Sequence, residues 1–240
     1  MVDKLVLAVI PARGGSKSIP NKNLLQIHGI SITKYALFSA QLNNQITHIA
    51  LSSDSDEILG EIESFKESRF IQVKRPTELS SDESPDQPML EHALRFSEDK
   101  FKVKFAVVVM LQPTSPVRSQ KDIDSCIKKV FEPTIDSSWT VSEVPVRFHF
   151  KKQFVIKNKR LTIATSEGHV PRRQDLKSSF HRDGACYAYK RWVILNDPLL
   201  MGSNCEPVIS EIITNDIDNF EDFYDLEKST FCRFNQLYWK

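Results

Sequence analysis

The chain has few of the residues and runs that mark disulfide-rich, metal-clustered, secreted or membrane proteins. Its 240 residues include 4 cysteines, and none of them has the C-x-x-C spacing of a zinc or redox site. We therefore expect reduced, buried thiols in a cytoplasmic protein. The apolar stretch near the N-terminus covers only residues 5–10, which is too short for the core of a signal peptide or for a membrane span.

An excess of charge of one sign is also missing. The 32 lysines and arginines balance 31 aspartates and glutamates, so the formal net charge is +1. Such a surface has no general attraction for nucleic acid, and any anion site has to be local. We expect neither nucleic acid nor a membrane as a partner. The apolar fraction of 40% is that of an ordinary globular protein with a sizeable core.

Apolar runs and helical patterns alternate over the first half of the chain. We expect strands at 5–12, 46–51, 70–73 and 105–111, and helices at 31–42, 56–65, 89–96 and 122–130. Strands that alternate with helices indicate βαβ units around a parallel sheet. The pattern therefore predicts an α/β fold with an open, mostly parallel sheet.

The pattern changes in the later part of the chain. We expect, in order, a strand at 139–144, a hairpin over 148–163, a polar arm over 165–182, a return to the sheet at 207–214 and a helix near 220–231. No linker, repeat or low-complexity tract separates a second domain. We therefore predict one domain, residues 1–240, with an extended arm at about 146–182.

Glycine is scarce, with 7 in the chain, yet two adjoin in the stretch IPARGGSKSIPNKN. Gly14 and Gly15 follow a predicted strand directly, and Arg13, Lys17 and Lys22 surround them. A glycine turn presents backbone N–H groups to phosphate oxygens, and arginine and lysine add charge. The stretch is neither a Walker A loop nor a G-x-G-x-x-G fingerprint. A solvated basic turn is the alternative, but three converging cations favour an anion site.

Polar side chains follow three of the predicted strands. Arg13, Asp54 and Gln112 stand at or just after strand ends. Open α/β sheets bind ligands at the carboxyl ends of their strands. We therefore expect these three side chains to meet at one edge of the sheet.

Two carboxylates late in the chain are spaced for a metal ion. Asp216 and Asp218 are two residues apart, so an extended backbone places both on one face. Like charges this close are unfavourable unless a cation joins them, and Mg²⁺ (or Mn²⁺) prefers such oxygen ligands. An isolated D-x-D is more often a surface turn. Together with the glycine loop it predicts a metal site.

Six segments together resemble the signature blocks of the CMP-sialic acid synthetases, the acylneuraminate cytidylyltransferases. They are IPARGGSKSIPNKNL (10–24), LSSD (51–54), RPTELSSD (75–82), LQPTSPVR (111–118), RRQDLKSSFHRDGACY (172–187) and NDID (215–218). The resemblance spans roughly residues 4–230. It implies a Rossmann-like fold of the nucleotide-diphospho-sugar transferase type, with helices on both faces of the sheet and a β-rich dimerisation extension.

The resemblance also implies an activity, in which CMP passes from CTP to the anomeric hydroxyl of a sialic-acid-like nonulosonic acid and pyrophosphate leaves. The residues implied to bind the nucleotide are Arg13, Gly14, Gly15, Ser16, Lys22, Asn23, Asp54, Arg75 and Asp86. Those implied in catalysis are Arg13, Lys17, Gln112, Asp216 and Asp218, the last two as metal ligands. Those implied to bind the sugar are Gln112, Arg173, Asp183 and Tyr187.

The family forms homodimers that exchange the arm, so Lys151, Lys152 or Arg173 is expected to act in the partner's site. The sugar stays open, because Asp183 replaces the family's asparagine, Lys177 its proline and Asp86 a serine or threonine. N-acetylneuraminate, legionaminate, pseudaminate and an 8-amino eight-carbon acid all fit. The alternatives are a guanylyltransferase or other nucleotidyltransferase acting on an amino-sugar phosphate, and a non-catalytic nucleotide-binding homologue.

Overall fold

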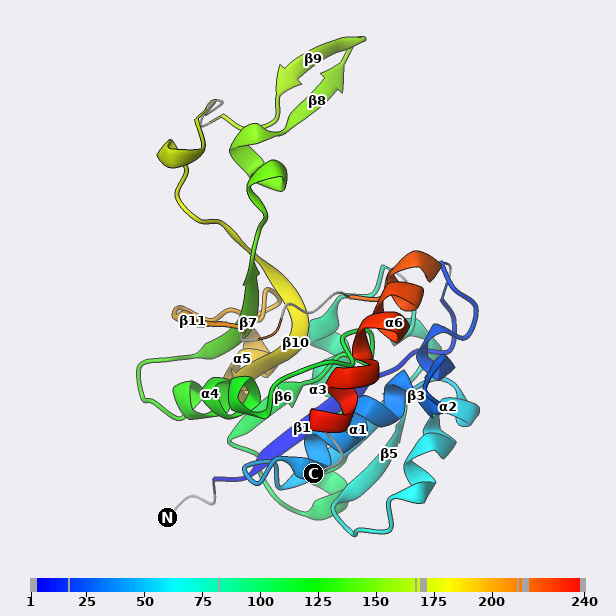
Figure 1. Ribbon diagram of the computed structural model, residues 1–240. Coiled ribbons are helices and arrows are strands. Elements are labelled where there is room, and N and C mark those ends of the chain that lie inside the picture. Colours follow the sequence, from blue (N-terminus) through cyan, green and yellow to red (C-terminus); the bar gives the residue numbers. More distant parts are fainter. Residues whose placement is uncertain are drawn as a thin grey trace.

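A seven-stranded sheet in the order β11-β7-β10-β6-β1-β4-β5 forms the centre of the protein (Figure 1). The computed structural model describes residues 4–16, 18–81, 83–166, 168, 172–210, 212 and 216–237, with the backbone alone at 173 and 229–237. The strands are β1 (Val6–Pro11), β4 (His48–Ser53), β5 (Phe70–Lys74), β6 (Val107–Met110), β7 (Ser137–Glu143), β10 (Phe180–Lys190) and β11 (Cys205–Ile209). The helices are α1 (Ile32–Leu42), α2 (Asp56–Gly60), α3 (Asp86–Phe101), α4 (Gln120–Val130), α5 (Arg191–Asn196) and α6 (Phe220–Leu237). A small hairpin, β2 (Gln26–Ile27) with β3 (Ile30–Ser31), precedes α1.

The sheet is mostly parallel, as its sequence pattern predicts. Strand β1 pairs in parallel with β4 and β6, β4 with β5, and β11 with β7. Its residues Val6 to Ile10 are at most 1% exposed, which explains the unbroken apolar run. Strand β10 is the exception, because it lies antiparallel between β6 and β7. The sequence pattern did not predict β10.

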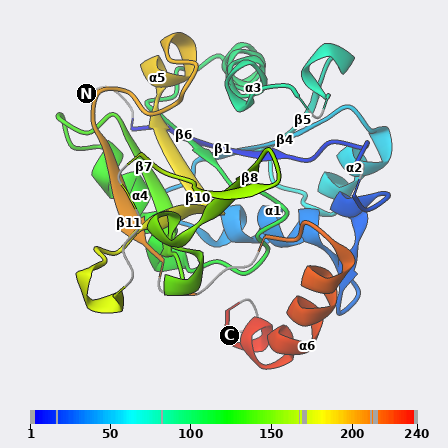
Figure 2. The same ribbon diagram turned by 90° about the horizontal axis from the view of Figure 1, so that it is seen from above.

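Helices cover both faces of the sheet and enclose two cores. Alternate residues of β1 point to opposite faces, so Ala8 packs with α1, α2 and α4, whereas Val9 packs with α3 and α5. Figure 2 shows α3 and α5 on one side of the sheet and α1 and α4 on the other. A third cluster joins the loop after β1 to α6 and contains Ile19, Val117 and Ile217. Through this cluster, residues near the end of the chain pack against the loop after β1.

An arm extends from the sheet on strands β7 and β10 (Figure 1). The hairpin of β8 (Phe154–Lys157) and β9 (Arg160–Ile163) confirms the expected turn at Asn158 and Lys159, although it starts six residues later than expected. Short 3-10 turns occupy 146–148 and 150–152 instead. On one face of the hairpin the apolar side chains are 46–76% exposed; they are Phe154, Ile156, Leu161 and Ile163. The arm therefore presents an uncovered apolar surface.

Candidate functional site

A cleft of about 240 Å³ lies at the carboxyl ends of β1, β5 and β6. It brings together the predicted residues Arg13, Ser16, Lys22, Asn23, Arg75, Asp86 and Gln112. They come from four separate segments, which meet because parallel strands end at the same edge of the sheet. Lys17 lies outside the described residues.

The loop after β1 is held in shape by side chains from its neighbours. The Gly14 N–H donates to Asp54 Oδ1 at 2.8 Å, and Asn23 Nδ2 donates to the Arg13 carbonyl at 2.9 Å. A Cβ on Gly14 would lie 2.9 Å from Ser55 Cβ, whereas a Cβ on Gly15 would meet nothing within 4 Å. Close approach therefore requires glycine at 14 only. Asp54 and Asn23 support the loop, and the Gly14 N–H is engaged by Asp54.

Arg75 is fixed to the end of β4. It is 6% exposed, and its Nη2 and Nε donate to the Ser52 carbonyl at 2.7 Å and to Ser52 Oγ at 3.2 Å. Burial lowers the pKa of Arg75 to about 10, while the charges of Asp54 and Asp86 act in the opposite direction and Arg13 adds to the lowering. The guanidinium stays cationic at neutral pH. Positive charge is therefore built into the wall of the cleft.

The acidic pair lies beside the first loop. Ile217, between the two aspartates, is fully buried and its N–H donates to the Thr114 carbonyl at 2.9 Å. Lys22 Nζ donates to the Ile217 carbonyl at 2.7 Å and lies 3.6 Å from Asp218 Oδ1. Asp216 Oδ1 accepts hydrogen bonds from Ser115 and Thr114. The pair thus joins the loop after β1 to the loop after β6.

The surroundings of the acidic pair fit a divalent cation. Burial raises the pKa of Asp216, the hydrogen bond from Ser115 opposes this, and the charge of Asp218 raises it further. The Asp218 side chain is 82% exposed. Excess negative charge on hard oxygen ligands is the environment that Mg²⁺ neutralises. In the described ranges, no group of three or more acidic, histidine or cysteine side chains is placed to hold a metal ion, so a cation at this pair would need further ligands from substrate and water.

Strand β10 reaches the cleft at Gly184. Its φ is 74°, and a Cβ there would overlap Ser115 and Asp216 and lie 3.0 Å from Gln112 Oε1. The Gly184 N–H donates to the Tyr187 hydroxyl at 2.6 Å. Tyr187, predicted to line the sugar pocket, is 2% exposed, and burial raises the pKa of its hydroxyl to about 12. Tyr187 therefore positions the glycine that touches the cleft residues.

The Asp183 carboxylate is enclosed by donors. The residue is 1% exposed and accepts from Thr140 Oγ1 at 2.6 Å, from Ser142 Oγ at 3.2 Å and from Ser210 Oγ. All three are hydroxyls, which suits an acceptor-only side chain better than an amide. In this arrangement Asp183 ties β10 to β7 and the end of β11 rather than presenting its carboxylate to a sugar.

Arg182 is a candidate site residue that the motifs did not single out. Its Cζ lies 4.7 Å from the ring centre of Trp139 and 4.4 Å from that of Tyr187. Its Nη2 is 3.6 Å from Asp86 Oδ2. The only signal in the sequence was its place directly before Asp183 and Gly184.

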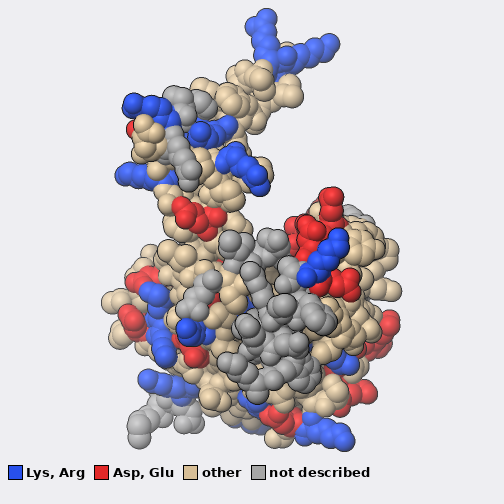
Figure 3. Space-filling view, viewed as in Figure 1, with Lys and Arg blue, Asp and Glu red and all other residues tan. Residues whose placement is uncertain are grey.

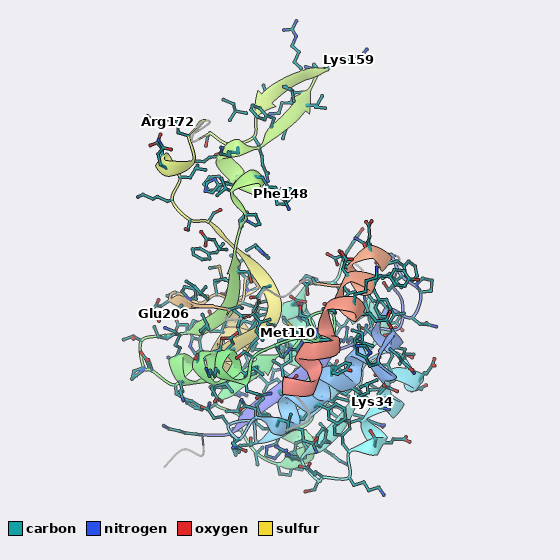
Figure 4. The ribbon with its side chains drawn as sticks, in the orientation of Figure 1. Lys34, Met110, Phe148, Lys159, Arg172 and Glu206 are labelled. Atoms are coloured by element: carbon teal, nitrogen blue, oxygen red, sulfur yellow. The ribbon has the colours of Figure 1, made fainter. Side chains whose placement is uncertain are left out.

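The arm residues lie away from the cleft of their own chain. In Figure 4, Phe148, Lys159 and Arg172 stand on the arm, far from Met110 in the sheet. Arg173 begins a short 3-10 turn (Arg173–Asp175) there, and its side chain lies outside the described part of the chain. Lys151 and Lys152 are in the turn that starts at Phe150. Figure 3 shows Lys and Arg over the arm, whereas Asp and Glu gather at the start of α6.

None of the helices in the described ranges combines the length and apolar character that a membrane span needs.

The chain is similar to known proteins in both sequence and fold. The family model described as Cytidylyltransferase matches residues 7–201. The chain is 31% identical to CMP-N,N'-diacetyllegionaminic acid synthase of Campylobacter jejuni over 223 residues, which cover 92% of this chain and 93% of the relative. It is 27% identical to Post-translational flagellin modification protein B of Campylobacter coli with the same coverage. A structure of CMP:2-keto-3-deoxy-manno-octonic acid synthetase complexed with CTP has a TM-score of 0.67, with 16% identity, over 94% of this chain and 98% of that one. This last likeness concerns the fold, which confirms the Rossmann-like class.

Proposed function

Because the chain belongs to the cytidylyltransferase family, we propose that it transfers CMP from CTP to the anomeric hydroxyl of a sialic-acid-like nonulosonic acid. The observation that carries the proposal is the meeting of three distant segments at one cleft. Lys22 links the loop after β1 to the acidic pair, and Ser115 links that pair to the loop after β6. A triphosphate and a sugar hydroxyl between these segments would meet cations, carboxylates and an amide together.

The nucleotide would lie along the loop after β1 and the start of α3. Arg13, Ser16 and Lys22 line the part of the cleft that suits phosphates, and Lys17 is expected to join them. Arg75 and Asp86 line the part that suits the ribose and base. The carboxylate of Asp86 accepts hydrogen bonds only, which suits the amino group of cytosine better than a carbonyl oxygen at the same position.

The sugar would lie where Gln112, Gly184 and Asp216 converge. In the reaction the anomeric oxygen forms a bond to the α-phosphorus, the bond to the bridging oxygen breaks, and pyrophosphate leaves. Little covalent chemistry falls to the protein, so positioning and charge neutralisation account for the rate. Gln112 is proposed to orient the sugar, and Arg13 to neutralise charge on the leaving pyrophosphate.

Asp216 and Asp218 are the residues that would hold Mg²⁺ or Mn²⁺. The bound ion would supply positive charge near the α-phosphate and the attacking hydroxyl. Within the protein, Lys22 is the cationic neighbour of the Asp218 carboxylate, and Ser115 donates a hydrogen bond to that of Asp216.

The arm supports a homodimer in which each arm reaches the partner's cleft. The uncovered apolar face of the hairpin requires a partner surface. Lys151, Lys152 and Arg173 would bring cations toward a carboxylated sugar, and the acidic start of α6 offers a complementary surface (Figure 3). Light scattering of the intact chain and of an Ile156→Lys, Leu161→Lys variant tests this, since a dimer should become a monomer with lower activity. A monomeric intact chain would contradict it.

The activity is tested by measuring pyrophosphate release with CTP and a panel of acids. The panel contains N-acetylneuraminate, legionaminate, pseudaminate and 8-amino and ordinary eight-carbon acids. GTP with an amino-sugar phosphate serves as the competing pair. We expect release with CTP and at least one nonulosonic acid. Release only with GTP, or none with any pair, would reject the proposal in favour of one of the two alternatives.

A further inference from the structure

Arg182 lies beside Asp86, a residue that lines the cleft, on the side where the nucleotide and the sugar are proposed to meet. It lies two residues before Gly184, which touches Gln112 and Asp216. Its ionic partner Asp86 lines the nucleotide part. Strand β10 and the start of α3 thus bring a cation to the place where the two substrates would meet.

The surroundings of Arg182 leave part of its hydrogen-bonding edge available, beside a hydrogen bond with the Tyr187 side chain. Trp139 and Tyr187 contact the faces of the guanidinium, with ring centres 4.7 and 4.4 Å from Cζ. Stacking on a face leaves the N–H groups in the plane directed outward. Asp86 Oδ2 lies 3.6 Å from Nη2, which is longer than a hydrogen bond. The side chain is 44% exposed. Arg182 is therefore oriented but not saturated by its acidic partner.

Two further polar groups beside this stack lack partners within the described part of the chain. The Trp139 indole nitrogen and the Tyr189 hydroxyl are buried and have no protein hydrogen bond. Trp139 contacts the Tyr187 ring at 5.8 Å and the Tyr189 ring at 6.5 Å between centres. Buried donors without acceptors are uncommon in native proteins. Both atoms are enclosed by protein and out of a ligand's reach, so the donor that a ligand can meet here is Arg182, whose side chain is 44% exposed.

The charge of Asp86 decides which acceptor fits. A carboxylate bound to Arg182 would stand beside the Asp86 carboxylate, and that repulsion would offset its attraction to the guanidinium. A neutral carbonyl oxygen gains the N–H donors without this penalty. Among the groups of a nonulosonic acid, the carbonyl of an acylamino substituent has this character. Its oxygen also reaches two bonds farther from the ring than a hydroxyl on the same carbon.

We infer that Arg182 is a specificity-determining residue that donates to the carbonyl oxygen of an acylamino substituent on the sugar. This inference rests on the proposed function and narrows its substrate class to acylamino acids. The sugar carboxylate is proposed to bind elsewhere, near the arm of the partner chain. Loss of a hydrogen bond from a charged donor corresponds to about a 10- to 100-fold loss in kcat/KM.

The test compares two acids that differ only in an acylamino group or a hydroxyl at one carbon. For each acid, kcat/KM is measured by pyrophosphate release, or as an inhibition constant where the acid is not turned over. The wild-type chain should prefer the acylamino acid by about 10- to 100-fold. Arg182→Ala should reduce the ratio of the two kcat/KM values to nearly one. The kcat/KM (or inhibition constant) for the hydroxyl acid should change little. Arg182→Lys keeps a positive charge near the aromatic rings but loses the planar guanidinium fork. Its preference for the acylamino acid should therefore lie between those of the wild type and of Arg182→Ala.

Matched controls separate recognition from folding. Arg95→Ala removes an exposed arginine of α3 that pairs with Glu91, and it should leave the preference unchanged. Melting temperatures of all variants are measured alongside. An equal loss for both acids would assign Arg182 to the shared carboxylate or to structure and overturn the inference. A wild-type chain without preference would also overturn it. No turnover of any acid by the wild-type chain would instead reject the proposed function, and the inference with it.

Discussion

Replacing Gly184 by alanine adds one methyl group where β10 touches the cleft. The backbone φ of 74° is a left-handed conformation, which costs a residue with a Cβ about 1–2 kcal/mol. The new Cβ would overlap the side chains of Ser115 and Asp216 and lie 3.0 Å from Gln112 Oε1. Overpacking of this kind costs about 1–3 kcal/mol more. We expect the free energy of unfolding to fall by about 2–5 kcal/mol.

The same substitution should reduce turnover more than CTP binding. Asp216 and Gln112 have to move to admit the methyl group, and a displacement of about 1 Å at a reacting centre costs roughly 10²-fold in rate. The three atoms nearest to the new methyl group belong to Ser115, Asp216 and Gln112 and none of them to the loop after β1, so KM for CTP should change little. Pyrophosphate release at saturating substrates and urea unfolding measure the two effects.

Gly60→Ala is the matched control. Gly60 has a φ of −61°, and a Cβ there would meet nothing within 4 Å. Alanine at such a helical position stabilises a protein by about 0.4–1 kcal/mol. If Gly184→Ala unfolds at the same urea concentration as Gly60→Ala and keeps wild-type turnover, the contact of β10 with the cleft is not what positions Asp216 and Gln112.

Three further predictions concern single side chains. Glu98 is a 4% exposed carboxylate whose burial raises its pKa, but hydrogen bonds from Arg191, Lys104 and the Phe105 N–H outweigh this and lower it to about 2. Glu98→Gln should therefore lower the free energy of unfolding by about 3 kcal/mol at pH 7. That difference from wild type is complete above the ordinary pKa of 4.5 and should shrink as the pH of urea unfolding falls toward 2, and a constant difference would contradict it. Asp218→Asn should raise the Mg²⁺ concentration for half-maximal activity about tenfold, and an unchanged titration would remove Asp218 as a ligand. Arg13→Ala should lower turnover at saturating CTP by about 10²-fold, and near-normal turnover would exclude its role.

Local patterns predicted the parallel core and its binding edge. The unbroken apolar run of β1 indicated a strand buried on both faces, and the polar residues after it indicated where a ligand would bind. The structure places Arg13 and Gln112 in one cleft, whereas Asp54, the third side chain expected there, accepts from the Gly14 N–H and is not among the residues that line the cleft. The spacing of Asp216 and Asp218 around one apolar residue matches the burial of Ile217 between them. The roles of these residues stay predictions.

Strand β10 was missed because its sequence has no strand pattern near the cleft. Asp183 and Gly184 interrupt the alternation, and the shift in register between Arg182 and Tyr187 accommodates them. What holds them there are contacts across long stretches of chain, such as Ser115 Oγ donating to the Asp183 carbonyl at 3.0 Å. Periodicity reports only neighbours along the chain and contains no trace of such contacts.

The sequence by itself indicated the segments that form the parallel strands, predicted an anion site at the first loop and carried the family resemblance, because each depends on consecutive residues. Only the tertiary structure decided that Asp183 faces hydroxyls, that Gly184 lies against Asp216 and that Arg182 stands beside Asp86. These three facts depend on an antiparallel strand inserted into a parallel sheet. Strand β10 is stabilised in that position by contacts between residues that are far apart in the sequence and meet only in the folded chain.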